Sequence, residues 1–370
     1  MVYFVVLALC SFIFEDGDSL IVDNDSLIIC GNHVYNYEVR VRNAGKLKVR
    51  QWGYLDTLGW LVLNAPLIVI EDSSSIIGSG CGFWGGSTTH PDGFGPGYGG
   101  SGPQGGGGGG GYGGEGGDGG DDNSGSGGSS YGDSADTLIN IGSGGGAGRL
   151  SVVDGFGGAG GAEVSLRGNE IIFDSSFIET KGQKGEDGAL EAGGGGSGGG
   201  IMIRADIASI HYTSMNADGG SGGNQSFGGG GGGAGGGRIK IFYVANLDTS
   251  HLDLSVEAGA GGSSGYGIAE SESGMPGSIY IAQITGIEEV VQATPLQHGV
   301  KTSLARNSIG ITIQHTPTTL MIYDVSGRLV KTFRLTNNTE IIDLHDLKQG
   351  VYFLKFAGVN KTLGKIVLLK

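Results

Sequence analysis

Glycine tracts recur at a nearly regular spacing along the middle of this chain, which is not expected of a flexible linker. The chain has 81 glycines in 370 residues, and most of them lie between Gly78 and Gly277. Four glycine tracts run directly into alternating apolar residues. The strands that these residues predict begin at Ala162, Ile201, Arg238 and Ser278, which are 39, 37 and 40 residues apart. A flexible linker does not conserve such a spacing, so the pattern predicts a repeat architecture.

The positions at which the predicted strands end repeat with a similar spacing. Strands end and glycine resumes near Thr180, Ala217 and Ala258. A strand with period-2 Ile, Val and Leu must bury one face, and parallel stacking of such strands buries it in a continuous core. The predicted fold class is therefore all-β: a right-handed parallel β-helix over residues 15–285, with glycine-rich excursions.

The excursions allow two interpretations. Glycine loses the most conformational entropy on ordering, which favours disordered loops. Alternatively, the tracts pack side by side as extended threefold helices that resemble polyglycine II, since backbones without side chains can approach closely. The longest excursion, residues 78–137, is the hardest to accommodate in an ordered structure.

The chain starts with about thirteen apolar residues followed by Glu15 and Asp16. This run is too short to span a bilayer and matches the length of a signal-peptide core, so residues 1–14 are predicted to be a signal segment. An N-terminal strand is the alternative. Because no other stretch is long and apolar enough to span a bilayer, we do not expect an integral membrane protein.

The net charge of −15 is unevenly distributed, because residues 300–370 carry ten Lys and Arg against four Asp and Glu. An acidic body argues against nucleic acid as a partner. It is compatible with cations, with a polar cell surface or with solubility alone. Cys30 and Cys81 would either form a disulfide after export or remain two thiols.

From residue 300 the pattern changes to about six short strands, which fit a small Greek-key β-sandwich after a linker at 286–299. Three segments, LMIYDVSGRLVKTF, LKQGVYFLKF and GKIVLLK, resemble the type A C-terminal sorting domain of the type IX secretion system. The residues that match its motifs are Tyr323, Asp324, Gly327, Arg328, Gly350, Tyr352, Lys365 and Lys370. The resemblance implies type IX machinery as a partner and delivery to the cell surface or the exterior. Residues 60–283 also resemble a class of glycine-rich bacterial secreted proteins.

Few residues are candidates for a catalytic or metal-binding role. Arg167, Arg204, Asp206, Arg238 and Lys240 could line one face of stacked rungs, as in a polysaccharide lyase or hydrolase, although ordinary outward residues of a strand explain them better. Asp118, Asp121 and Asp122 are weak Ca²⁺ candidates, and a solvated acidic loop is the preferred interpretation. We expect no enzyme, no metal site and no cofactor.

Aromatic residues set among the glycines remain. They are Phe83, Trp84, Phe94, Tyr98, Tyr112, Tyr131, Phe227 and Tyr266. Trp84, Tyr98, Tyr112 and Tyr131 are candidates for contact with a surface polysaccharide or another cell, and the alternative is that aromatic rings pin the loops to the coil. The sequence thus predicts an exported structural or adhesive surface protein, with a β-helix polysaccharide-degrading enzyme as the alternative.

Overall fold

The computed structural model describes residues 11–53, 59–150, 152–284 and, in the C-terminal part, 302–305, 308–312, 318–324, 328–335, 339–344, 346–348, 350–356 and 364–368. The chain divides into two compact units, Met1–Ile287 and Glu288–Lys370. Every regular element described is a β-strand, so the all-β prediction is confirmed for these residues. No helix in them is long and apolar enough to cross a membrane.

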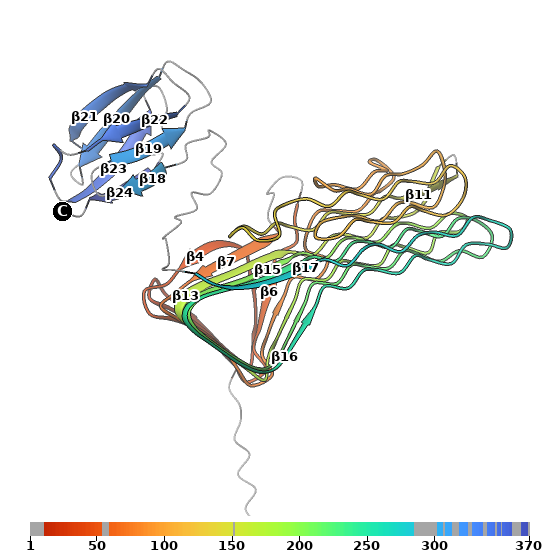
Figure 1. Ribbon diagram of the computed structural model, residues 1–370, viewed down its shortest axis with the longest axis horizontal. Coiled ribbons are helices and arrows are strands. Elements are labelled where there is room, and N and C mark those ends of the chain that lie inside the picture. The colour runs from red at the N-terminus through yellow and green to blue at the C-terminus, as the bar shows by residue number, and fades with distance from the viewer. Residues whose placement is uncertain are drawn as a thin grey trace, which may run out of the picture. The chain divides into compact units, whose positions relative to one another are not determined.

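The first unit is a coil of parallel strands with three faces, and its outline is triangular in Figure 1. One face contains β2 (Ser19–Asp23), β5 (Glu38–Arg42) and β8 (Leu67–Ile70). The second contains β3 (Ser26–Ile29), β6 (Lys46–Val49), β9 (Ser75–Ile77) and β14 (Phe177–Glu179). The third contains β4 (Gly31–Val34), β7 (Trp60–Asn64) and β17 (Ser278–Gln283).

Three long strands bend around the corners and so serve more than one face. They are β13 (Glu163–Asp174), β15 (Gly200–Asn216) and β16 (Arg238–Ser255). Glu163 lies opposite Gly200, Gly200 opposite Arg238, and Arg238 opposite Ser278. The glycine-to-strand transitions of the sequence therefore lie one above the other on the third face.

The alternating apolar residues point into the coil. Val39, Ile68, Ile171 and Ala208 are successive partners across β5, β8, β13 and β15, and all four are fully buried. Such a column gives each strand a buried face that it could not have alone, which is the physical reason for stacking. At the first rung, β1 (Phe12–Glu15) pairs antiparallel with β2 and its residues are exposed. Residues 12–14 of the predicted signal segment lie in this strand, and residues 1–10 lie outside the described part.

The glycine-rich excursions are ordered and form a projection, which we call the arm (Figure 1). It comprises the described residues of 78–162 together with 180–199, 217–237 and 256–277. Each excursion leaves from the end of the second face and returns at the start of the third. Near the free end lie the short strands β10 (Gln104–Gly105), β11 (Gly148–Leu150) and β12 (Val152–Gly155).

Hydrogen bonds with a period of three residues hold the arm together. Gly107, Gly108 and Gly109 donate to three different tracts, at Ala192, Gly100 and Gly117. Their carbonyl groups accept from three further tracts, at Gly232, Gly146 and Gly128. This is the packing expected for threefold extended helices of the polyglycine II type, and it satisfies the backbone without a hydrophobic core.

Only glycine fits at these positions. A Cβ on Gly107 would lie 2.1 Å from the carbonyl oxygen of Gly146, and one on Gly109 would lie 2.1 Å from that of Gly233. Both distances are far below van der Waals contact. Of the two interpretations that the sequence left open, the structure shows the ordered one.

The second unit consists of two antiparallel sheets. One contains β18 (Thr302–Ala305), β19 (Ser308–Thr312) and β22 (Thr339–Asp343). The other runs in the order β21 (Leu329–Leu335), β20 (Thr318–Asp324), β23 (Gly350–Phe356) and β24 (Gly364–Leu368). Buried Leu320, Ile322 and Leu354 come from the larger sheet and Ile342 from the smaller one.

Candidate functional site

The sorting-domain motif residues shape the hairpin between β20 and β21. Asp324 Oδ1 accepts the N–H of Arg328 at 3.1 Å, and its Oδ2 accepts Arg328 Nε at 3.1 Å. The N–H of Asp324 donates in turn to the Arg328 carbonyl at 2.9 Å. An aspartate that bonds backbone N–H groups is a common way to fix a tight turn. Gly327, in the same motif, lies outside the described residues.

The second motif segment forms the neighbouring strand. Tyr352 on β23 pairs with Asp324 on β20, is 7% exposed, and donates its hydroxyl to the Lys348 carbonyl at 2.7 Å. Gly350 lies opposite Leu368, and Lys365 of β24 lies opposite Phe353. Tyr323 donates its hydroxyl to the sulfur of Met321. Lys370 lies outside the described residues.

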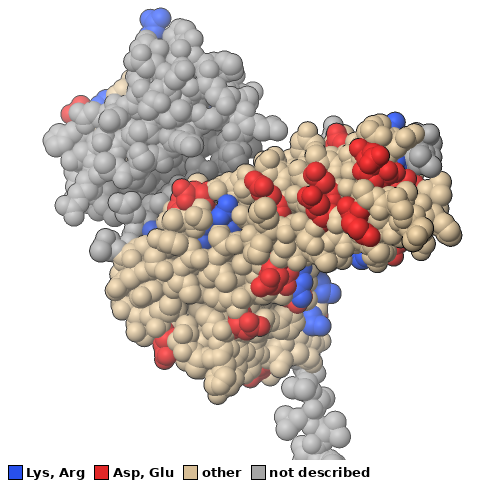
Figure 2. Space-filling view, turned by 45° about the vertical axis from the view of Figure 1, so that its right-hand side comes forward, with Lys and Arg blue, Asp and Glu red and all other residues tan. Residues whose placement is uncertain are grey.

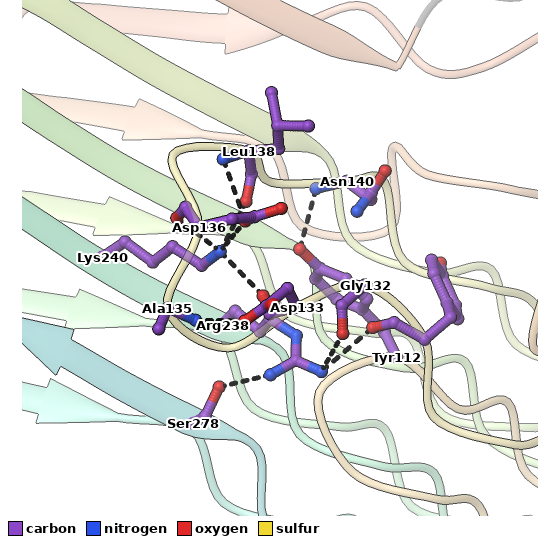
Figure 3. Close-up of polar contacts among 11 residues, drawn as sticks. Tyr112, Gly132, Asp133, Ala135, Asp136, Leu138, Asn140, Arg238, Lys240 and Ser278 are labelled. Carbon is purple, nitrogen blue, oxygen red and sulfur yellow. Dashed lines mark hydrogen bonds and ion pairs between the residues drawn. The ribbon is translucent and has the colours of Figure 1, made fainter.

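Two cations of β16 hold the returning part of the long excursion against the third face (Figure 3). Lys240 is fully buried, and its Nζ donates to the carbonyls of Asp133, Asp136 and Leu138 at 2.6–3.0 Å. It also lies 2.7 Å from Asp136 Oδ1. We call residues 131–141 the strap. A buried ammonium is tolerated only when such oxygens replace its water.

Arg238 secures the start of the same strap. Its guanidinium donates to the carbonyls of Tyr131 and Gly132 at 3.0 Å and to Ser278 Oγ at 2.7 Å. It also lies over the ring of Tyr112, 5.6 Å from the centroid. Arg238 and Lys240 are therefore bound to the strap within the protein.

Tyr112 lies inside the arm, where burial removes it from the predicted contact surface, and Tyr131 beside it is partly buried. Tyr112 is fully buried, and its hydroxyl accepts the N–H of Asn140 at 2.7 Å. The Tyr131 hydroxyl donates to the Ile141 carbonyl, and the two rings are 4.8 Å apart. Burial raises the pKa of both phenols. Both hydroxyls thus bind backbone groups of the strap.

Of the remaining candidates for catalysis, Arg167 and Arg204 lie opposite each other on β13 and β15. Arg204 is 6% exposed on the third face, and Asp206, beyond it, accepts a hydrogen bond from Asn169 at 3.0 Å. Next to the strap, burial raises the pKa of Glu163 to about 7, an effect that Arg167 partly offsets. Burial lowers the pKa of Arg167 itself. Ile139 of the strap packs on Met202 and Phe242, and so covers part of this face.

Trp84 and Tyr98 retain exposed surface, at 37% and 49%. Trp84 belongs to an aromatic cluster at the base of the arm, with its ring edge-on to Trp52 at 5.4 Å. Phe83 and Phe94 also contact Trp52, which is 8% exposed. Trp84 therefore packs against the other rings of the cluster and is also accessible to solvent.

Two of the three calcium candidates accept backbone N–H groups. Asp118 Oδ1 accepts the N–H of Gly127, and Asp121 Oδ1 accepts that of Asp122. Within the described part of the chain, no group of three His, Cys, Asp or Glu is arranged to hold a metal ion. Cys30 and Cys81 are free thiols, and burial raises the pKa of Cys81.

The turns at the free end of the arm form a ladder that the sequence analysis did not identify. Asn224 donates its N–H to Asp187 Oδ1 at 2.6 Å, and Ser263 donates its N–H to Asn224 Oδ1 at 2.9 Å. These partners are 37 and 39 residues apart, the same offset that stacks the strands. We call the turns 154–156, 186–191, 223–228 and 262–268 the arm tip. The offset, applied to the turns, would have revealed it.

Comparison with known proteins identifies one part of the chain. Residues 305–370 match the family model of the secretion system C-terminal sorting domain. No curated protein matches the sequence. The matched residues include the Asp324–Arg328 hairpin and the strand that carries Tyr352, so the motif prediction and the family match agree. The second unit of this chain thus carries a type IX secretion sorting domain.

Proposed function

We propose that this chain is a structural or adhesive protein, exported by the type IX system and either attached to the cell surface or released. The sorting domain at residues 305–370 carries the export part of the proposal. We also infer that the coil is a right-handed parallel β-helix, because parallel crossover connections are right-handed in nearly all proteins. By the same kind of inference, the second unit is a Greek-key sandwich.

The structure of the arm favours a role in which the protein binds another molecule or surface. Its glycine tracts bond to several neighbouring tracts at once, so the arm is internally cross-bonded. Such a projection holds its end turns away from the coil (Figure 1). Rigid elements that present exposed turns are the usual scaffold for recognition surfaces.

We propose further that the first unit, which consists of the coil and the arm, acts by binding another surface and not by catalysis. Lys240 and Arg238, two of the candidates for polysaccharide cleavage, bind carbonyl groups of the strap. A substrate would have to displace residues 131–138 to reach them. The observation favours the structural role over the degrading enzyme.

Export is tested by deletion of residues 300–370 in a host that has type IX secretion. We expect the truncated protein to stay inside the cell, as judged by its protection from protease added to intact cells. The matched control fuses residues 286–370 to an unrelated secreted protein with its own signal peptide, which should reach the exterior. Normal surface display of the truncated chain would refute the proposal.

A further inference from the structure

Apolar side chains at the arm tip are exposed in a regular order. Leu190, Phe227 and Tyr266 occupy matching positions on successive turns, and their exposures are 46%, 82% and 106%. Phe156 on the preceding turn is 41% exposed. These turns touch, since the backbone at Gly265 lies against that of Phe227 and Gly228 lies against Leu190.

Phe227 and Tyr266 are more exposed than Trp84 and Tyr98 of the arm, whose exposures are 37% and 49%. Tyr112 is fully buried, and Trp52 at the base of the arm is 8% exposed. Exposed apolar side chains gathered on one part of a surface usually mark an interaction site. Around them lie Gly, Ser, Asn and Gln, and rigid rings among small polar residues make up the contact surfaces of many binding loops.

The arm tip is also acidic. Its turns carry Asp154, Glu186, Asp187 and Glu191, and Glu270 and Asp121 lie on adjoining segments. Lys184, beside them, is paired with Asp187 at 2.7 Å. On the face drawn in Figure 2, acidic side chains follow the arm toward its free end. Glu186 and Asp187 are exposed, whereas Glu191 is buried. Burial, together with the charges of Asp121 and Asp154, raises the pKa of Glu191, and hydrogen bonds lower the pKa of Asp154 and of Asp187.

We propose that the arm tip binds a polysaccharide whose sugars carry free amino groups. This inference rests on the proposed function and names the partner of the contact surface. A sugar ring presents a flat C–H face that covers Phe227 or Tyr266, and a protonated amine pairs with nearby carboxylates and with the negative face of the rings.

The negative charge of the arm tip favours a cationic polysaccharide over a neutral or anionic one. An anionic polymer would be repelled by the exposed carboxylates of Glu186 and Asp187, and a neutral one would gain nothing from their charge. An amine-bearing polymer gains from both features. Because its units repeat, it can contact several turns at once, which raises the overall affinity.

The test uses the full chain and two soluble hexasaccharides with one backbone, a β-1,4-glucosamine hexamer and its fully N-acetylated form. Binding is measured by calorimetry at pH 6 in low salt, with polylysine as a third ligand. We expect the glucosamine hexamer to bind and the acetylated hexamer to bind at least about tenfold more weakly, as a lost charge contact implies.

Variants assign the binding to the tip. Phe227→Ala combined with Tyr266→Ala should weaken binding about tenfold or more, since each ring contact is worth a factor of several. Glu186→Gln should weaken it about threefold. The matched control is Tyr37→Ala, which removes a ring that is 66% exposed on the coil and should leave binding unchanged. Circular dichroism checks that all variants fold alike.

Three outcomes would overturn the inference. Equal binding of both hexamers would exclude the role of charge. Equal binding of polylysine, unaffected by the Phe227 and Tyr266 substitutions, would show a surface that attracts any cation. No binding of the glucosamine hexamer, with surface delivery intact, would reject the partner and leave the proposed function standing. Failure of delivery in the deletion experiment would reject the proposed function itself.

Discussion

The Nζ atom of Lys240 lies 2.7 Å from Oδ1 of Asp136, although 104 residues separate them in the chain. The ammonium is fully buried, whereas the Asp136 side chain is 37% exposed. Three backbone carbonyls of the strap complete the surroundings of the ammonium. This contact holds the strap of the longest excursion against the third face of the coil.

Lys240→Met should free the strap. The variant leaves three carbonyls and a partly exposed carboxylate without their buried donor, and loss of hydrogen bonds to a buried charge costs about 3 kcal/mol. We expect this loss in the free energy of unfolding of the first unit and faster amide exchange over residues 131–141. Lys184→Met is the control, because the Lys184–Asp187 pair has the same 2.7 Å separation but both side chains are about half exposed. Equal stability of the two variants would contradict a structural role for Lys240.

Gly109→Ala should disrupt the arm from within. The added Cβ would meet the Gly233 carbonyl oxygen at 2.1 Å, and this atom cannot move without shifting its whole tract. We expect a loss of about 3 kcal/mol or more, the upper range for overpacking, with increased amide exchange along the arm. Gly17→Ala, where no atom lies within 4 Å, should be neutral or slightly stabilising. An unchanged exchange pattern in Gly109→Ala would contradict the close packing of the tracts.

Glu163 should make the first unit less stable as pH rises. Its pKa is about 7 in the folded protein against 4.5 ordinarily, so the folded state holds the proton more tightly. The stabilisation is complete below pH 4.5 and is lost as pH rises through 7. The difference corresponds to about 3 kcal/mol at most, because the side chain keeps partial contact with solvent.

Urea unfolding of the first unit at pH 4.5, 6 and 8 would measure this dependence. Glu163→Gln should remove most of the fall in stability over that range. Glu170→Gln alters an exposed carboxyl on the same strand and should keep the wild-type profile. A profile for Glu163→Gln that matches the wild type would place the titrating group elsewhere.

Part of this architecture could be predicted from the sequence because its signals are local and periodic. Strands predicted to begin at Ala162, Ile201, Arg238 and Ser278 begin within one residue of those positions. Alternation of apolar residues fixes which side chains enter the core, and the Asp324–Arg328 hairpin follows from a short motif. Each of these features depends on neighbours a few residues away or on one repeated offset.

The rest depends on contacts that no local pattern encodes. Lys240 has the alternation of an ordinary outward residue, and only the return of residues 131–138 across the third face buries it. Tyr112 and Tyr266 both stand alone among glycines, yet one is buried and the other fully exposed. Their difference comes from position within the packed tracts, which the hydrogen bonds between distant segments decide.

Tyr112→Phe tests whether the buried hydroxyl of Tyr112 stabilises the strap. The substitution keeps the ring but removes the hydroxyl that accepts the Asn140 N–H, so a buried donor loses its partner. We expect the free energy of unfolding to fall by about 1–2 kcal/mol, with the largest change in amide exchange at Asn140. Tyr98→Phe makes the same chemical change on a ring that is 49% exposed and should alter stability by less than about 0.5 kcal/mol. If Tyr112→Phe were equally silent, the hydroxyl of Tyr112 would contribute nothing to the stability of the strap, and the contacts of Arg238, Lys240 and Ile139 would hold it without that hydrogen bond.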